Sequence, residues 1–514
     1  MKVRKAGDAA SVAAALVVIV LFARCAAQLA AYPWDWSPDE GLFLDWGRRL
    51  VTDPASLYAR SFVPYPAAYG PGLPALLAPF AGLGERMLAG ARLLALGWSL
   101  VSALAVYVLV KRPAGPVFGI AAAALALAAF DVSFWLMLVR PDGPMIALWL
   151  LAAIPLLPAR LEGGGDRLTH GRLAAGSLLV LAAVLTKPTA VVHAAPLVLG
   201  WLLVDRRSFL RLVLLLGALG LLSLGLLQLA TAGGFLWLQR VWSTHGTMAG
   251  LMQVILVHSL GRMWPFAAFA ALSGALAFRA TRRAGPLFTD GAWLLVLGAA
   301  VVVPLLSKYG ASWNYLVPMM PALVVLACRW LAVALPAGAP GPRGAFGPAL
   351  TAATAIALVL TRPFPLPTAL DRRTADAFYA FVKEHTRRSG GPILAMRPEL
   401  AYFVVGQPVE MEGSTFVRLA RYNVAGSELL LQRLREGRYT LLVELHALPD
   451  TGGYLEAKER NYVHAGGCNL SFYFATAPVH LFTRRDLPLY FTPPADTRCG
   501  GPAAAAAASP LPPP

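Results

Sequence analysis

Residues 87–110 read MLAGARLLALGWSLVSALAVYVLV and contain one charged side chain, Arg92. A helix of this length crosses the ~30 Å hydrocarbon core of a bilayer. Further apolar runs lie on both sides of this stretch, at 10–31, 115–132, 143–159, 173–187, 188–204, 210–231, 263–280, 290–307, 315–336 and 346–362. The sequence therefore predicts an α-helical polytopic membrane protein with about eleven transmembrane helices.

The composition agrees with this prediction. Charged residues make up 14% of the chain and hydrophobic residues 57%, against roughly 25% and 45–50% in soluble proteins. So few charges cannot cover a water-exposed surface, which excludes a soluble enzyme. The formal net charge of +17 comes from short basic clusters between apolar runs, which excludes a nucleic-acid-binding face and indicates membrane orientation instead.

The basic clusters predict the orientation of the chain. With the N-terminus inside, the inner connections hold Lys2/Arg4/Lys5, Lys111/Arg112, Arg160/Arg167/Arg172, Arg206/Arg207/Arg211, Arg279/Arg282/Arg283 and Arg343. The outer short loops hold fewer cations, so we expect a cytoplasmic N-terminus and an extracytoplasmic C-terminal part in a cell plasma membrane. The first run could instead be a signal peptide, but its apolar part exceeds the usual ~7–15 residues, which favours an uncleaved helix.

The C-terminal part has a different composition. Charges reappear from Asp371, and helical patterns at 374–387 and 427–435 alternate with β-type runs at 392–394 and 439–443. We expect a transmembrane domain over 1–362, a small extracytoplasmic α/β domain over 363–500, and a low-complexity disordered tail over 501–514. Cys468 and Cys499 fall on the oxidising side of the membrane and are candidates for a disulfide.

The first outer loop, 32–86, contains the sequence Trp34-Asp35-Trp36-Ser37-Pro38-Asp39-Glu40-Gly41. One interpretation is structural, because Ser37, Pro38 and Glu40 have the spacing of a capping box that opens a helix. That interpretation leaves Asp39 in the first turn without a partner. A carboxylate beside an apolar boundary can be desolvated and act as a base, so Asp39 is also a candidate catalytic residue.

The rest of this loop is rich in proline and tyrosine. Its prolines, which rule out a straight spanning helix, are Pro64, Pro66, Pro71, Pro74 and Pro79, and Tyr65 and Tyr69 lie among them. We expect a re-entrant or surface-lying segment over a cavity.

Ionisable residues recur in the other outer turns. They are Asp131, Arg140 and Asp142 in the second turn, Lys187 in the third, and Lys308 in the fifth, which continues to Asn314 and Tyr315. A local Arg140–Asp142 ion pair and lysines that snorkel to the interface are the structural alternatives. Ionisable groups at this depth are nevertheless candidates for function.

Several motifs occur in order on the predicted outer side. They are Asp39-Glu40 in the first loop, the Tyr/Pro-rich stretch followed by Gly90-Ala91-Arg92, Val139-Arg140-Pro141-Asp142, Leu185-Thr186-Lys187-Pro188-Thr189, and Lys308-x-Gly310 with Asn314-Tyr315. In this order they resemble the GT-C membrane glycosyltransferases, and most closely the bacterial members akin to protein O-mannosyltransferases and the lipid A aminoarabinose transferase. The resemblance covers residues 10–362 and, loosely, the C-terminal domain.

The resemblance implies an enzyme that takes a hexosyl or pentosyl group from a polyprenyl-phosphate carrier and transfers it to a glycan, lipid or protein acceptor on the outer face. The family's catalytic carboxylate corresponds to Asp39, with Glu40 beside it. The candidate substrate-binding residues are Arg140, Asp142, Lys187, Lys308, Asn314 and Tyr69. The chain departs from the family at Phe43, where the family has a tyrosine.

The chemistry of a lipid-linked donor requires an intramembrane groove, cations for the phosphate leaving group and a carboxylate for the acceptor hydroxyl. The sequence supplies these groups on one face, and direct displacement would invert the anomeric carbon. No cofactor is required, although Asp35 and Asp39 could share a divalent ion. A ligase or polymerase of surface polysaccharide remains an alternative. A lipid-linked-sugar flippase or transporter is a weaker alternative. Such a protein would show internal repeats and polar groups near the bilayer midplane, whereas this sequence shows no repeat and its polar residues gather at the predicted outer ends.

Overall fold

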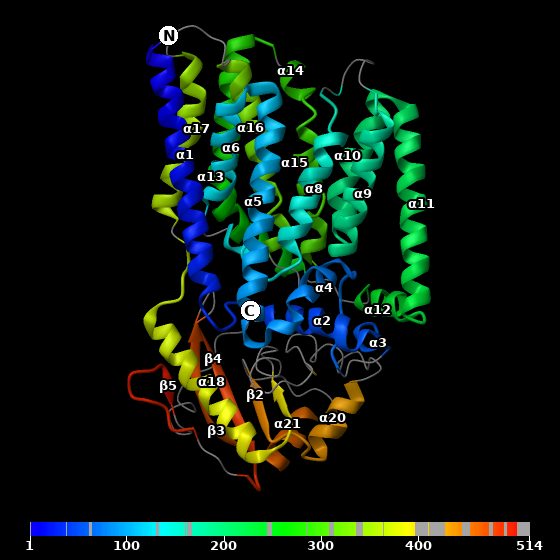
Figure 1. Ribbon diagram of the computed structural model, residues 1–514, viewed down its shortest axis with the longest axis vertical. Coiled ribbons are helices and arrows are strands. Elements are labelled where there is room, and N and C mark those ends of the chain that lie inside the picture. The colour runs from blue at the N-terminus through cyan, green and yellow to red at the C-terminus, as the bar shows by residue number, and fades with distance from the viewer. Residues whose placement is uncertain are drawn as a thin grey trace.

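The computed structural model describes residues 2–37, 39–60, 64–129, 133–159, 161, 167–243, 249–283, 285–307, 313–335, 343–362, 364–395, 410, 427–444, 453–471, 476–487 and 491–500. Figure 1 shows a bundle of long, roughly parallel helices above a small sheet with flanking helices. Short helices lie across the end of the bundle between these two layers (Figure 1). The predicted fold class is confirmed, since the chain is mainly helical with a small C-terminal α/β part.

Each predicted span coincides with a helix of the bundle. These helices are α1 (Lys2–Ala30), α5 (Met87–Ala114), α6 (Pro116–Ala128), α8 (Asp142–Leu156), α9 (His170–Thr186), α10 (Ala190–Val204), α11 (Arg206–Ala230), α13 (Ala249–Thr281), α15 (Trp293–Ala300) followed by η3 (Val303–Ser307), α16 (Met319–Ala334) and α17 (Arg343–Thr361). Within the described residues, six helices are long and apolar enough to cross a membrane, and other apolar helices are shorter. The chain is a multi-pass membrane protein, and the number of crossings stays a prediction.

Burial differs across the bundle as expected for helices in lipid. In α6 the run 121–128 is buried and consists mainly of alanine, which allows α1, α5 and α17 to pack closely around it. In contrast, α11 exposes a row of leucines, and Leu229 is 82% exposed. Exposed apolar rows of this length are suited to contact with lipid chains rather than water.

The described part of the predicted first outer loop, 32–86, folds as short helices and not as a span. It comprises α2 (Glu40–Thr52), α3 (Pro54–Leu57), α4 (Gly72–Leu77) and η1 (Ala78–Arg86), and Figure 1 shows α2, α3 and α4 across the lower end of the bundle. A Cβ atom on Gly70 would lie 2.1 Å from the carbonyl oxygen of Leu185. Glycine thus allows the loop to touch the end of α9, directly before Lys187.

The C-terminal part is a sheet with helices on both faces. Its strands are β1 (Ile393–Ala395), β2 (Leu441–Glu444), β3 (Tyr462–Ser471), β4 (Thr476–Arg484) and β5 (Cys499–Gly500), in the order β1-β2-β4-β3-β5, with β1 and β2 parallel and the other neighbours antiparallel. Helix α18 (Ala369–Ser389) packs on one face, and α20 (Ser427–Arg435) and α21 (Tyr454–Asn461) pack on the other. The predicted helices at 374–387 and 427–435 therefore lie within α18 and on α20.

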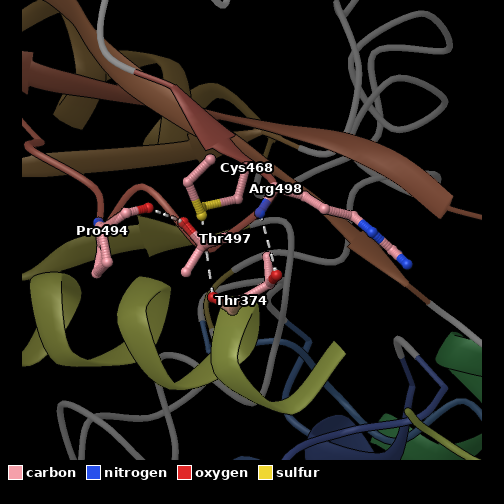
Figure 2. The surroundings of a disulfide bond; sticks show 6 residues. Thr374, Cys468, Pro494, Thr497 and Arg498 are labelled. Atoms are coloured by element: carbon pink, nitrogen blue, oxygen red, sulfur yellow. Dashed lines mark hydrogen bonds between the residues drawn. A yellow bond between two sulfur atoms is a disulfide. The ribbon is translucent and has the colours of Figure 1, made fainter. Parts of the chain in front are cut away.

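Helix α18 begins and ends at clear sequence signals. Thr368 and Asp371 form a capping box, and Gly390 ends the helix in the left-handed region with φ of 65°. The last described segment is held against the sheet by a disulfide between Cys468 in β3 and Cys499 in β5. Figure 2 shows Arg498 beside this disulfide, where its backbone N–H donates to Thr374 Oγ1 of α18 at 3.2 Å.

Candidate active site

Glu40, the first residue of α2, forms a buried ion pair with Arg92 of α5. Arg92 Nη2 lies 2.6 Å from Glu40 Oε2, and Arg92 Nε donates to Oε1 at 3.0 Å. The other end of the guanidinium donates to the carbonyls of Leu29 and Tyr32 at the end of α1. The pair therefore joins α1, α2 and α5 at the base of the first outer loop.

The charge state of Glu40 follows from its donors. Burial acts to raise its pKa, but Arg92 and the backbone N–H groups of Val139 and Trp36 outweigh burial and hold the pKa below the usual value. Both carboxylate oxygens accept hydrogen bonds from these donors, which favours the ionised form of Glu40. These contacts are those of a structural ion pair, and the expected catalytic role of Glu40 stays a prediction.

The expected capping box is half formed. Glu40 Oε2 accepts from the backbone N–H of Ser37 at 3.2 Å, as the spacing predicts. The Ser37 hydroxyl does not cap the helix but accepts from Arg140 Nη1 at 2.9 Å. Asp39 precedes the helix and makes no side-chain cap bond, and Pro38 lies outside the described residues. The Ser37 and Asp39 side chains both accept from Arg140, so the turn before α2 is joined to the turn that carries Arg140.

Asp39 has a partner, contrary to the sequence-based expectation. Arg140 Nη1 lies 2.5 Å from Asp39 Oδ2, although 101 residues separate the two. The Asp39 side chain is 28% exposed and the Arg140 side chain 10% exposed. Asp39 is thus a carboxylate at the edge of the protein that remains open to a ligand.

Aromatic rings surround the guanidinium of Arg140. Its Cζ atom lies 4.3 Å from the centroid of the Trp135 ring and 5.8 Å from that of Phe43. Both rings are in the range of a cation–π interaction, which holds the cation in place and keeps water from it. Phe43, the departure from the family pattern, therefore contributes its ring face to this site.

Asp142 connects Arg140 to two further outer turns. Lys187 Nζ lies 2.6 Å from Asp142 Oδ1, and Asn314 Nδ2 donates to the same oxygen at 3.1 Å. Arg140 Nε is farther away, 3.6 Å from Asp142 Oδ2. The local Arg140–Asp142 pair is therefore the weaker one, and Asp142 mainly compensates the charge of Lys187.

These contacts bring together residues that are distant in sequence, as the predicted topology requires. We call the set Asp39, Arg140, Asp142, Lys187 and Asn314 the outer charge cluster, because these residues lie in turns that the sequence predicts to be outer. Its side chains come from the first outer loop, the start of α8, the turn after α9 and η4 (Trp313–Leu316). Opposite charges alternate along Asp39, Arg140, Asp142 and Lys187, so the described cluster is neutral.

Two tyrosines border the outer charge cluster. Lys187 Nζ lies 4.6 Å from the centroid of the Tyr315 ring. Burial and the neighbouring Tyr315 raise the pKa of Tyr69, so the Tyr69 phenol stays protonated. The Tyr69 carbonyl accepts from the Tyr58 hydroxyl at 3.0 Å, which fixes the loop. Tyr69 can thus donate a hydrogen bond toward a ligand at the cluster.

Some of the predicted site residues are not placed. Lys308 and Asp131 lie outside the described residues. Asp35, considered as a metal ligand with Asp39, accepts from the backbone N–H of Gly41 at 2.9 Å. In the part of the chain that the structure describes, no group of three or more His, Cys, Asp or Glu residues could hold a metal ion.

Two residues of the site were not among the predicted site residues: Trp135, and Arg92, which was named only as part of a family motif. The signal for Arg92 was available, since it is the one charge within the apolar run 87–110 and such a charge requires a partner. Trp135 had no comparable signal, because an apolar ring near a span is usually packed in the core. Its role depends on the position of Arg140 relative to η2 (Phe134–Leu136).

The α/β part packs against the turn that carries Asp39. The Trp34 ring stacks on Tyr379 of α18 with 3.8 Å between ring centroids, and Trp34 Nε1 donates to Asp376 Oδ1 at 2.6 Å. Trp36 Nε1 donates to the Pro365 carbonyl at 2.9 Å. The C-terminal part thus lies at the same end of the bundle as the outer charge cluster (Figure 1).

A family model and several solved structures are similar to this chain. Residues 68–228 match the model described as dolichyl-phosphate-mannose-protein mannosyltransferase. No curated protein matches the chain in sequence. ArnT from Cupriavidus metallidurans in the apo state superposes with a TM-score of 0.54 and 15% identity, over 91% of this chain and 97% of ArnT.

Two further structures show the same similarity. ArnT from Cupriavidus metallidurans bound to undecaprenyl phosphate has a TM-score of 0.52 and 15% identity, over 91% of this chain and 97% of ArnT. The Archaeoglobus fulgidus oligosaccharyltransferase tethered with an acceptor peptide has a TM-score of 0.50 and 13% identity, over 92% of this chain and 74% of that chain. Identities this low establish the fold alone. The chain therefore has the fold of the GT-C membrane glycosyltransferases, the superfamily that its sequence motifs resemble.

Proposed function

We propose that this protein is an inverting glycosyltransferase that moves a sugar from a polyprenyl-phosphate carrier to an acceptor on the outer face of the membrane. The observation that carries the proposal is the Asp39–Arg140 pair, in which a partly exposed carboxylate lies 2.5 Å from a guanidinium enclosed by aromatic rings. A base and a phosphate-binding cation are thus adjacent. Transfer from a phosphate-linked sugar requires both groups.

The first step assigns Arg140 to the donor phosphate. A planar guanidinium binds phosphate oxygens through two parallel N–H donors. Arg140 is paired with Asp39, so a donor phosphate has to compete with that carboxylate. If Arg140 turns to the phosphate, the Asp39 oxygen is released, and donor binding thereby prepares the base.

The second step is displacement at the anomeric carbon. Asp39 Oδ2 takes the proton of the acceptor hydroxyl, and the acceptor oxygen forms a bond to the anomeric carbon. The bond from that carbon to the phosphate oxygen breaks, and the polyprenyl phosphate leaves with the electron pair. Arg140, with Lys308 from the fifth turn, stabilises the charge that develops on the leaving oxygen. Attack opposite the leaving group inverts the configuration.

The remaining members of the outer charge cluster position Arg140 and the substrates. Asp142 compensates the charge of Lys187, and Asn314 donates to the same carboxylate oxygen. Lys187 therefore mainly fixes the position of Asp142, and its charge is not left over for the phosphate. Tyr69 is a protonated donor for a sugar hydroxyl or a phosphate oxygen. We propose that Arg140 rather than a divalent ion binds the donor phosphate, and that Asp35 supports the loop through its bond from the backbone N–H of Gly41.

The proposal includes the location of the reaction. We place the N-terminus in the cytoplasm and the α/β domain, residues 363–500, on the outer face of the cell plasma membrane. This placement follows from the basic clusters on the inner connections. It puts the outer charge cluster where a lipid-linked sugar meets an outer-face glycan, lipid or protein.

A comparison of lipid extracts tests the proposed function without knowledge of the acceptor. Cells that lack the gene should accumulate a polyprenyl-phosphate sugar, measured by mass spectrometry, because its consumer is absent. Restoring the wild-type gene should return that lipid to its original level. Identical polyprenyl-phosphate sugars in both extracts would contradict the proposed donor class.

A further inference from the structure

The turn that precedes Asp39 is tied to the helix bundle through its backbone. Arg92 Nη2 donates to the Trp34 carbonyl at 2.9 Å, and the backbone N–H of Trp36 donates to Glu40 Oε2 at 2.9 Å. Arg92 and Glu40 are the two members of the buried ion pair at the base of this turn. The backbone of residues 34–36 is therefore fixed to α5 and α2.

The α/β part holds the indole rings of the same turn. The Trp34 ring stacks on Tyr379 of α18 with 3.8 Å between centroids and an interplanar angle of 9°. Trp34 Nε1 also donates to Asp376 Oδ1 at 2.6 Å, and Trp36 Nε1 donates to the Pro365 carbonyl, just before α18. The turn is thus held from both sides, by the bundle and by the α/β part.

The contact between Trp34 and α18 has a defined geometry. Stacking fixes the plane of the indole ring, and the bond from Nε1 to a carboxylate fixes the rotation of the ring within that plane. The Tyr379 side of the contact is rigid, because Tyr379 is buried in the core of the α/β part. The position of the Trp34 ring therefore follows the position of α18.

Asp39 depends on this turn for its own orientation. Within the described residues, the Asp39 side chain meets Arg140 and makes no cap bond to α2. The direction of its carboxylate is therefore set largely by the backbone that leads to it from Trp34. A displacement of about 1 Å at a reacting group lowers a rate by roughly 100-fold, so the anchoring of this backbone bears on the rate.

We propose that Trp34 is a positioning residue for the transfer reaction, and that its contacts with Asp376 and Tyr379 of α18 hold the Asp39 carboxylate in place at Arg140. Trp34 acts through the backbone of the turn and not by contact with the substrate. The inference rests on the proposed function, because it takes Asp39 as the base. It makes the α/β part a determinant of the geometry of the site.

Steady-state kinetics of the full chain test the proposal with the polyprenyl-phosphate sugar identified from the lipid extracts. Trp34→Ala should lower kcat at least about tenfold and leave the KM for the donor within about twofold, because the phosphate still meets Arg140. Trp34→Phe keeps a ring on Tyr379 and should retain part of kcat. Asp376→Asn keeps an acceptor oxygen for the indole N–H and should turn over like the wild type.

The matched control is Phe381→Ala, which removes an aromatic contact of α18 that does not involve the turn. The Phe381 and Phe491 ring centroids lie 4.9 Å apart in the core of the α/β part. Phe381→Ala should lower the melting temperature at least as much as Trp34→Ala and leave kcat unchanged. If Trp34→Ala does not fold, Asp376→Ala takes its place, since it lacks the acceptor that Asp376→Asn keeps and should lower kcat.

Hydrogen–deuterium exchange gives a readout that needs no substrate. The peptide that covers residues 35–43 should exchange faster in Trp34→Ala than in the wild type, and Phe381→Ala should leave its exchange unchanged. If the wild type transfers no sugar from this donor, the proposed function fails, while the exchange comparison still decides whether α18 fixes the turn.

Four results would overturn the proposal. They are wild-type kcat in a folded Trp34→Ala protein, an equal fall of kcat in Phe381→Ala, unchanged exchange of residues 35–43 in Trp34→Ala, and a raised donor KM with unchanged kcat. The last result would make Trp34 a substrate contact instead of a positioning residue.

Discussion

Replacing Glu40 with glutamine should destabilise the protein far more than the loss of a helix cap. Five donors point at the Glu40 carboxylate: the backbone N–H groups of Trp36, Ser37 and Val139, and Nε and Nη2 of Arg92. The amide nitrogen of glutamine cannot accept a hydrogen bond. At least two of these donors would therefore face an N–H group in a buried site.

The expected cost follows from these contacts. Each buried donor left without an acceptor costs about 1–3 kcal/mol, and a buried arginine left without its counter-ion costs about 3–5 kcal/mol. These terms overlap, so we expect a loss of about 3–5 kcal/mol. If Glu40 served only in a helix cap, as its spacing from Ser37 suggests, the same substitution would cost ~0.5–2 kcal/mol.

Thermal unfolding of the purified protein in detergent measures this difference. Glu40→Gln should lower the melting temperature strongly, whereas Asp39→Asn, which removes a partly exposed partner, should change it little. Asp53→Asn removes an exposed carboxylate from the same loop and serves as the control. A Glu40→Gln protein as stable as the Asp53→Asn protein would refute the structural role of the Glu40–Arg92 pair.

Three further predictions concern the cations and the topology. Lys308→Ala should lower turnover at saturating donor at least tenfold, about 1.4 kcal/mol of barrier, and Lys308→Arg should retain part of it; normal turnover of Lys308→Ala would mean that this lysine only snorkels. Lys187→Met should lower the free energy of unfolding by about 3–5 kcal/mol, because it leaves Asp142 buried without its closest cation. Adding Asp142→Asn to Lys187→Met should restore stability if this reason is right. A reporter active only in the cytoplasm should be inactive when fused at Arg388, and an active reporter would reverse the orientation.

The sequence predicts the helices well because their signals are local. Apolar runs, basic clusters and cap residues each depend on neighbouring positions, and α20 begins and ends at the predicted residues, 427 and 435. The short strands β1 and β2 begin and end one or two residues away from the predicted β-type runs. Strand ends are set by partners across the sheet, which local sequence does not reveal.

The sequence predicts which residues form the candidate site but not which of them form ion pairs with one another. Asp39, Arg140, Asp142 and Lys187 were candidates from their places in the predicted outer loop and turns, and Asn314 was a candidate from the family resemblance. The structure brings these residues together. Which cation meets which carboxylate depends on distances across the bundle, and these are not encoded in local spacing. For this reason the sequence suggested an unpartnered Asp39 and, as a structural alternative, a local Arg140–Asp142 pair.

The most direct test of the proposed mechanism is the turnover of Asp39→Asn measured with the polyprenyl-phosphate sugar identified from the lipid extracts. Loss of a general base should lower turnover by about 10²–10⁴-fold, while Asp53→Asn, in the same loop, should turn over like the wild type. Folding of each protein is checked by its melting temperature. If a folded Asp39→Asn protein releases polyprenyl phosphate at the wild-type rate, Asp39 is not the base and the account of this site is contradicted.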